Sequence, residues 1–251
     1  MNAKDIRAKM QRGATIGTWL QLPSPDVAEL MGHAGYDWVA VDMEHGLFAR
    51  VGLADICRAI ELGGTAPFAR VAEASKNEIK GALEAGVQGL IFPMIESLAQ
   101  LDEAISWATY PDRGGSRGVG FSRANLYGKE LAAYREGTAG DMILVAQIEH
   151  IRAVDELPQI LAHPRLDAIM VGPYDLSGSM GLTGCFDHPD FIAVMQRIQD
   201  ACIQHGANMG VHVVDPDPGE LARRVQQGYR FIAYGIDAVF LWQGIQRPQC
   251  A

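Results

Sequence analysis

The sequence has no apolar run that approaches the roughly 18 consecutive residues needed to cross a membrane. Its opening segment, MNAKDIRAKMQRG, lacks the apolar core of a secretory signal. Basic residues are not gathered into a patch, and 30 acidic against 21 basic residues give a formal net charge of -9. We therefore expect a cytoplasmic protein with no nucleic-acid partner and no membrane partner.

Cysteine is scarce as well. The four cysteines form no CxxC pair, which excludes a zinc finger and predicts reduced thiols in place of disulfides. No GxGxxG follows the first predicted strand, and neither a GxSxG elbow nor a P-loop occurs. The usual signatures of dinucleotide binding, serine hydrolysis and P-loop phosphate binding are therefore missing.

Lysine is absent from every predicted strand. A Schiff-base mechanism needs a lysine inside the site, so carbonyl chemistry in this chain has to use a metal ion as its electron sink. The sequence contains only five lysines: Lys4, Lys9, Lys76, Lys80 and Lys129.

The chain does contain the composition of a globular protein, with 48% hydrophobic and 20% charged residues. Eight apolar or β-branched runs alternate with helical stretches, and glycines stand at several helix-to-strand turns. This alternation predicts a (β/α)8 barrel that forms a single domain over residues 1–251, with an open doubly wound sheet as the alternative. The predicted strands are residues 15–22, 38–43, 66–71, 89–94, 142–149, 168–172, 208–214 and 230–235.

Two segments interrupt the alternation. Residues 110–128 lie between the fourth and fifth predicted strands and contain five glycines and three arginines, and residues 174–188 follow the sixth strand. Barrels carry such excursions preferentially at their catalytic end. Each segment is therefore predicted to be either a functional loop or a mobile surface loop.

Polar residues at the ends of the apolar runs are the candidate catalytic groups, because barrel active sites lie at the carboxyl ends of the strands. Glu149 and Asp175 follow neighbouring strands, which predicts a site for Mg²⁺, Mn²⁺ or Co²⁺ with open positions for substrate. The alternative is that each carboxylate only caps the next helix. The other candidates are Asp42, Glu44, His45, Arg70, Gln147, Gly172, Pro173, Tyr174, His212, Asp215 and Asp237.

Arg70 lies inside the apolar sequence PFARVAE. Burying a guanidinium is costly unless it meets an anion, so we expect it to face bound negative charge. A structural ion pair with Glu44 or Glu149 is the alternative. An arginine and a metal ion together allow an acidic protein to bind an anionic metabolite.

His45 directly follows the second strand. Histidine titrates near neutral pH, which makes His45 the candidate general base, unless it is merely a solvated loop residue. A base of this kind needs a group that fixes its tautomer. We expect that group to be the carboxylate of Asp42 or Glu84.

The sequence contains, in this order, GTWLQLPSPDVAELMGHAGYDWVAVDMEHG, PFARV, FPMIES, YPDRGGSRGVG, VAQIE and VGPYDLSGSMG. Together these segments resemble the metal-dependent (class II) pyruvate aldolases of the HpcH/HpaI family, of the 4-hydroxy-2-oxoheptanedioate and 2-dehydro-3-deoxyglucarate aldolase type. The resemblance covers nearly the whole chain but does not specify the aldehyde substrate.

The resemblance implies a divalent metal cofactor (Mg²⁺, Mn²⁺ or Co²⁺) held by Glu149 and Asp175, with His45 as the base and Arg70 beside the enolate oxygen. Glu84 is a departure, because it stands where the prototype has an aspartate that assists the histidine. The implied substrate site comprises Trp19, Gln147, Gly172, Pro173, Tyr174 and Asp175, although Trp19 also fits an ordinary core position.

The implied reaction is reversible retro-aldol cleavage of a 4-hydroxy-2-oxo acid to pyruvate, or hydroxypyruvate, and an aldehyde. Two alternatives are an acyl-CoA lyase related to the citrate lyase β-subunit and a non-catalytic barrel that binds 2-oxo acids. The apolar tail, residues 238–251, is predicted to pack on another subunit. The resemblance accordingly implies a homo-oligomer, a trimer-based hexamer whose terminal helices are exchanged.

Overall fold

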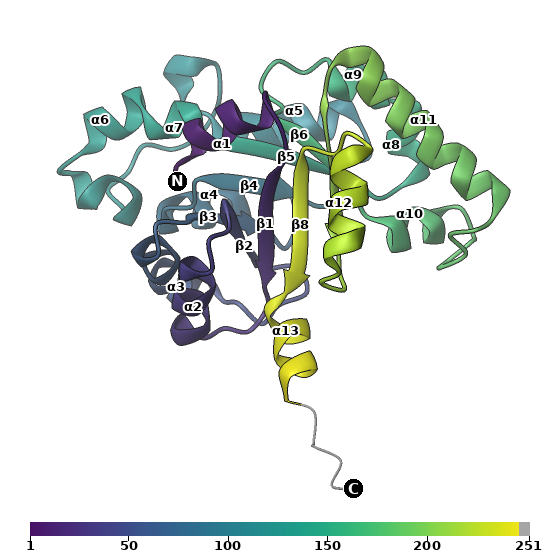
Figure 1. Cartoon of the computed structure of the whole chain (residues 1–251). Helices are drawn as coiled ribbons and strands as arrows, with labels where there is room; N and C mark the ends of the chain where they lie inside the picture. Colours follow the sequence, from purple (N-terminus) through teal and green to yellow (C-terminus); the bar gives the residue numbers. More distant parts are fainter. Residues whose placement is uncertain (246–251) are drawn as a thin grey trace, which may run out of the picture.

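The computed structural model describes residues 1–245 and contains a closed barrel of eight parallel strands in sequence order (Figure 1). Each strand begins and ends within two residues of its predicted bounds, which confirms the (β/α)8 prediction over the open-sheet alternative. The strands are β1 (Thr15–Leu20), β2 (Trp38–Asp42), β3 (Ala66–Arg70), β4 (Gly89–Phe92), β5 (Ile143–Ile148), β6 (Ala168–Val171), β7 (Asn208–Val213) and β8 (Phe231–Ile236).

Helices surround the barrel because each crossover between parallel strands returns along its outer face. Left-handed glycines end two of the longer helices, Gly86 after α4 and Gly206 after α11. The helices that position the barrel and its site are α1 (Ala3–Met10), α2 (Pro25–His33), α3 (Arg50–Leu62), α4 (Lys76–Ala85), α5 (Leu98–Ala108), α8 (Ile151–Asp155), α9 (Leu157–Leu161), α10 (Pro173–Ser179), α11 (Pro189–His205), α12 (Pro218–Gln226) and α13 (Asp237–Gly244).

The interior of the barrel is filled by aromatic side chains. Trp38 stacks on Phe231, with ring centroids 4.3 Å apart, and on Phe68 at 5.5 Å. A Cβ at Gly17 would run into the Trp38 ring, so only glycine fits beside it on β1. Residues of α1 belong to the same buried cluster, and this helix lies across the amino-terminal end of the barrel (Figure 1). The open end is therefore the carboxyl end of the strands.

The segment 110–128 does not reach that open end. It follows α5 and leads towards the start of β5, so it belongs to the amino-terminal side of the barrel. Its central arginine, Arg117, is buried, with its guanidinium 4.5 Å from the Tyr110 ring centroid and 5.3 Å from that of Tyr134. This position argues against the first of the two interpretations, a functional loop at the catalytic end. Glycine and arginine content does not reveal which end of a barrel a connection occupies.

The terminal helix α13 projects away from the barrel, as Figure 1 shows at the lower edge of the molecule. It includes residues 238–244 of the predicted apolar tail, and residues 246–251 of the tail lie outside the described residues. No helix within residues 1–245 combines the length and the apolar character needed to span a bilayer.

Candidate functional site

The candidate site is a cavity of about 220 Å³ at the carboxyl ends of the strands. Every strand except β4 supplies or precedes a lining residue, so the barrel brings together groups that lie far apart in the sequence. The predicted site residues that line the cavity are Trp19, Asp42, His45, Arg70, Gln147, Glu149, Gly172, Pro173, Tyr174 and Asp175.

Arg70 reaches the cavity from the end of β3 and is fixed by Asp42 at the end of β2. The two residues are direct neighbours in the strand register, and two bonds join them: Arg70 Nε to Asp42 Oδ1 at 2.9 Å and Arg70 Nη2 to Asp42 Oδ2 at 2.7 Å. Burial disfavours the charge of Asp42, but the hydrogen bonds and charge of Arg70 outweigh it and hold the pKa of Asp42 below its ordinary value. A buried, bidentate pair of this kind fixes the guanidinium plane.

Glu44 adds a second negative charge beside this arginine. Its Oε2 lies 3.1 Å from Arg70 Nη1, close enough for an ion pair but without hydrogen-bond geometry. Burial raises the pKa of Glu44 above its ordinary value. The alternative of an ion pair between Arg70 and Glu44 is therefore present, and the one with Glu149 is not among the ion pairs of the described residues.

Trp19 and His212 form the side of the cavity next to Arg70. The Arg70 guanidinium lies 4.5 Å from the centroid of the Trp19 ring, within the range of a cation–π contact. The Trp19 indole also meets the ring of His212 edge to face, with centroids 5.9 Å apart. Trp19 is buried, but it is a wall of the cavity and not only a core residue.

Glu149 is held by three features of neighbouring strand ends. Its Oε2 accepts a hydrogen bond from the Met94 backbone N–H at 3.0 Å, and its Oε1 accepts one from Gln147 Nε2 at 2.8 Å. A Cβ on Gly172 would lie 2.7 Å from Glu149 Cγ, so only glycine leaves room for this carboxylate. Burial, assisted by the charges of Glu44 and Asp175, raises the pKa of Glu149 to about 7.

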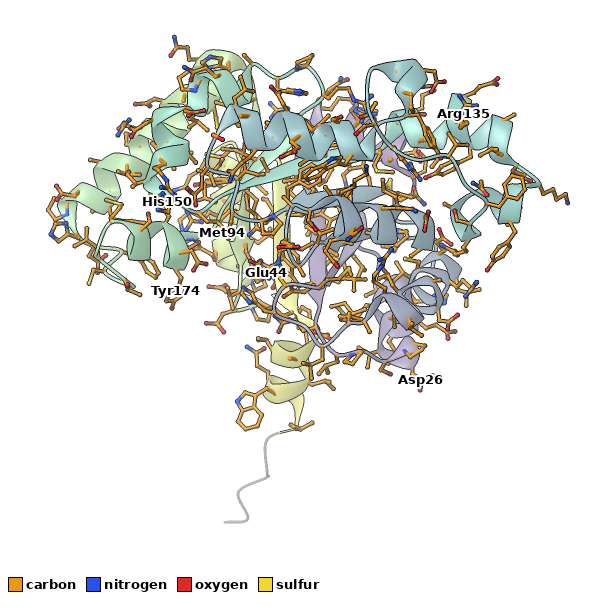
Figure 2. All side chains as sticks on the ribbon, turned by 180° about the vertical axis from the view of Figure 1, so that it is seen from behind. Asp26, Glu44, Met94, Arg135, His150 and Tyr174 are labelled. Atoms are coloured by element: carbon orange, nitrogen blue, oxygen red, sulfur yellow. The ribbon has the colours of Figure 1, made fainter. Side chains whose placement is uncertain are left out.

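The Met94 backbone that binds Glu149 has a φ of 51°, which a non-glycine residue adopts only at a cost. This left-handed turn after β4 presents the Met94 N–H to the carboxylate. Figure 2 labels Met94 and Glu44 near the middle of the molecule. Sequence reasoning missed Met94, because no residue type signals a positive φ at methionine.

Asp175 lies in the first turn of α10, which starts at Pro173 and is separated from β6 only by Gly172. It lines the same cavity as Glu149, and its negative charge is one of the causes of the raised pKa of Glu149. Within residues 1–245 no group of three or more His, Cys, Asp or Glu side chains is arranged to hold a metal ion. A two-carboxylate arrangement nevertheless suits a hard cation that keeps several waters or substrate oxygens.

His45 lies at the rim of the cavity with 59% of its side chain exposed. Its ring Nε2 is 3.8 Å from Glu44 Oε2. Asp42 does not meet the ring: it accepts a hydrogen bond from the His45 backbone N–H at 3.2 Å, and both its carboxylate oxygens bind Arg70. The expected Asp42–His45 side-chain pairing is thus replaced by the Asp42–Arg70 pair.

Glu84 is not brought to the cavity. It lies in the last turn of α4, where its carboxylate is 3.7 Å from Lys80 Nζ. Because α4 leads back to the start of β4, this turn lies towards the opposite end of the barrel from His45. The predicted pairing of Glu84 with His45 is therefore not formed within this chain.

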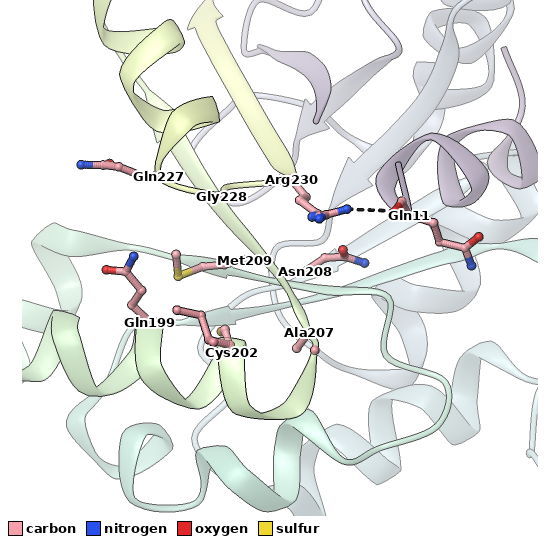
Figure 3. A pocket seen from close by; sticks show the side chains of 11 residues that line it. Gln11, Gln199, Cys202, Ala207, Asn208, Met209, Gln227, Gly228 and Arg230 are labelled. Carbon is pink, nitrogen blue, oxygen red and sulfur yellow. Dashed lines mark hydrogen bonds between the residues drawn. The ribbon is translucent and has the colours of Figure 1, made fainter. Parts of the chain in front are cut away.

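A larger cavity of about 610 Å³ lies at the amino-terminal end of β7 and β8 (Figure 3). Its lining includes amide side chains and Arg230, and the Arg230 guanidinium donates to the carbonyl oxygens of Met10 and Gln11. Among residues 1–245, no carboxylate or histidine lines it. It therefore offers none of the carboxylate and imidazole groups that the smaller cavity brings together.

Comparison with known proteins finds relatives that match nearly the whole chain. A family model described as HpcH/HpaI aldolase/citrate lyase matches residues 15–243. A hydroxypyruvate/pyruvate aldolase of Paraburkholderia phytofirmans is 35% identical over 231 residues, which cover 90% of this chain and 88% of that protein. A 2-keto-3-deoxy-L-rhamnonate aldolase of Klebsiella pneumoniae is 32% identical over 239 residues, with coverages of 94% and 88%.

The fold agrees with the sequence comparison. An HpcH/HpaI aldolase/citrate lyase family protein from Burkholderia cenocepacia superposes with a TM-score of 0.89 at 32% identity, and the match covers 96% of each chain.

Proposed function

We infer the reaction from one premise: this chain belongs to the HpcH/HpaI aldolase/citrate lyase family. Its curated relatives are aldolases that carry the names of pyruvate, hydroxypyruvate and keto-deoxy acids. The chain accordingly catalyses reversible retro-aldol cleavage of a 4-hydroxy-2-oxo acid to pyruvate, or hydroxypyruvate, and an aldehyde. We further propose that it is a class II enzyme that depends on a divalent metal ion.

The donor set fits a hard divalent cation. Glu149 is only 3% exposed, yet Met94 and Gln147 hold its carboxylate in one orientation, and Gly172 leaves the space it occupies. A nearby positive charge stabilises the ionised form most strongly in a carboxylate that is buried and has a raised pKa, as Glu149 does. Glu149 and Asp175 are the residues that would hold Mg²⁺, Mn²⁺ or Co²⁺, and such an ion acts as a Lewis acid that withdraws electrons from the 2-oxo group.

Arg70 supplies the fixed positive charge of the site. In the cleavage direction the electron pair of the C3–C4 bond moves onto the 2-oxo fragment and becomes an enolate. A guanidinium held rigidly by Asp42 and by the Trp19 ring stabilises that charge without having to reorganise. We propose that the backbone N–H groups of Tyr174 and Asp175, in the first turn of α10, bind the substrate carboxylate.

His45 is the proposed base. It takes the proton of the 4-hydroxyl group as the C3–C4 bond breaks, so that C4 leaves as the aldehyde carbonyl. A proton then returns to C3 of the enolate, which gives the 2-oxo acid and balances the reaction. The exposed position of His45 at the rim suits a group that exchanges protons with solvent through a water molecule.

The single observation that carries this proposal is that Glu149, Asp175 and Arg70 line one small cavity at the carboxyl ends of the strands. The test is to remove metal with a chelator, add Mg²⁺, Mn²⁺ or Co²⁺, and measure pyruvate released from a panel of 4-hydroxy-2-oxo acids. We expect release that depends on the added ion. No release with any ion, from any substrate of the panel, would refute the proposal.

A homo-oligomer, a trimer-based hexamer, is proposed as the assembly. α13 leaves the barrel, with Leu241 45% exposed and Ile245 66% exposed. Apolar side chains on a projecting helix favour burial against another copy of the chain. Light scattering coupled to size-exclusion chromatography tests the assembly, and a monomer at micromolar concentration would contradict it.

A further inference from the structure

The cavity has two chemically different halves. The charged side chains come from the ends of β2, β3, β5 and β6, whereas β7, β8 and β1 contribute His212, Ile236 and Trp19. A 2-oxo acid carries its oxygen atoms on C1 and C2, and these belong with the charged half. The C3 end of the molecule therefore faces the wall made by β7, β8 and β1.

Gln21, which follows β1, also lines the cavity, but its amide donates to Asp42 Oδ2 at 2.8 Å. The other polar groups of that wall are the His212 imidazole and the indole N–H of Trp19. The methyl group of pyruvate needs only an apolar wall, which a leucine or valine would provide. The position instead holds an imidazole at the end of β7, within a strand that is otherwise apolar apart from its first residue, Asn208. An unpaired polar group in a desolvated site costs free energy. A polar group on this wall therefore indicates a ligand with a polar atom at this position.

A backbone carbonyl fixes which nitrogen of the His212 ring carries the proton. Its Nε2 lies 3.2 Å from the Gly235 carbonyl oxygen, which only accepts hydrogen bonds, so Nε2 carries the proton. Gly235 has a φ of 69°, a left-handed conformation at the end of β8 that aims this carbonyl into place. Burial lowers the pKa of His212 to about 4, so the ring is neutral at physiological pH.

A neutral ring protonated at Nε2 leaves Nδ1 as a hydrogen-bond acceptor. No other residue of the described chain binds His212 Nδ1. Trp19 Nε1 is a donor, buried on the same wall and likewise without a partner among residues 1–245. The two rings meet edge to face with their centroids 5.9 Å apart, so the acceptor and the donor belong to adjacent side chains of the wall. A hydroxyl group, which donates one hydrogen bond and accepts others, complements this pair.

We propose that His212, with Trp19 beside it, recognises a hydroxyl group on C3 of the 2-oxo acid, so that hydroxypyruvate is preferred to pyruvate as the nucleophilic substrate. The inference rests on the proposed aldolase function and adds to it the identity of the donor and the residue that selects it. The C3 hydroxyl donates to Nδ1 of His212 and stays on the product, next to the carbon–carbon bond that forms. His212 is thus a specificity-determining residue.

The test compares kcat/KM for hydroxypyruvate and for pyruvate, each with D-glyceraldehyde as the acceptor and Mg²⁺ as the ion. The wild-type protein should prefer hydroxypyruvate by at least about tenfold, the ordinary effect of one buried hydrogen bond. His212→Leu should lower this preference at least about tenfold, because it replaces the acceptor by an apolar group. His212→Asn, which keeps an acceptor near the position of Nδ1, should retain most of it.

The matched control is His205→Leu, which makes the same replacement on the exposed last turn of α11 and should leave the preference unchanged. A wild-type preference for pyruvate, or a preference that His212→Leu and His205→Leu change equally, would overturn the inference while the aldolase proposal stands. If neither donor reacts, the proposed function fails and the inference with it. The wild-type ratio needs no variant, so the inference stays testable even if His212→Leu folds poorly.

Discussion

Replacing Gly172 by alanine tests the role of Glu149 without removing its carboxylate. Gly172 follows β6 with a φ of -99°, a conformation that alanine adopts without strain. The added Cβ would lie 2.7 Å from Glu149 Cγ, 2.9 Å from Cδ and closer still to Oε1. The only atom introduced is therefore aimed at the carboxylate that we propose as a metal ligand.

The size of the effect follows from these contacts. Carbon atoms pack at about 3.5 Å, so the Glu149 side chain has to move by about 1 Å. A shift of that size disrupts its hydrogen bonds from Met94 and Gln147, at 3.0 and 2.8 Å. Misplacement of a catalytic group by about 1 Å costs about 10²-fold in rate, and disturbed ligand support weakens metal binding about 10- to 100-fold.

The assay is Mg²⁺ titration by calorimetry together with kcat/KM for pyruvate release, on protein whose circular dichroism shows it to be folded. Gly13→Ala is the matched control, because a Cβ at Gly13 meets no atom within 4 Å. It should bind Mg²⁺ and turn over like the wild type. Wild-type Mg²⁺ affinity and activity in Gly172→Ala would refute the assignment of Glu149 as a ligand.

Three further predictions concern Arg70, His45 and Glu149. Arg70→Lys keeps the positive charge but loses the bidentate bond to Asp42. We expect kcat/KM for pyruvate release to fall about 10²-fold and the thermal unfolding temperature to drop. Full activity of this variant would contradict the role of the guanidinium. His45→Asn should lower kcat of cleavage by about 10²- to 10⁴-fold, measured by the same assay, and a smaller loss than tenfold would exclude His45 as the base. Burial raises the pKa of Glu149 to about 7, and a metal ion binds only the ionised carboxylate. The affinity for Mg²⁺ should therefore rise about tenfold per pH unit up to pH 7 and then level off. An affinity that does not change between pH 5.5 and 7 would show that Glu149 is not the ligand.

The strands could be predicted because a strand that is covered on both faces has a nearly continuous apolar sequence. The runs at 66–71 and 168–172, for example, end within one residue of the observed β3 and β6. The polar residues directly after such runs then had to lie at one end of the barrel. This reasoning placed Glu149, Asp175 and Arg70 correctly in one cavity.

The pairing of these residues could not be predicted, because it depends on strand register and on backbone turns. Asp42 binds Arg70 because the two are register neighbours on β2 and β3, and a sequence does not display that register. Met94 contacts Glu149 through a backbone N–H, which leaves no trace in the residue type. Glu84 was also expected beside His45, but the direction in which α4 runs separates the two residues.

Exchange of the C3 protons of pyruvate and of hydroxypyruvate with D2O, followed by NMR, tests the central claim most directly, since it reports enolate formation without any aldehyde. We predict exchange in the presence of Mg²⁺ that slows at least about 10²-fold after chelation and also in Glu149→Gln. No exchange of either acid with Mg²⁺ present, or exchange that is equally fast after chelation, would contradict it.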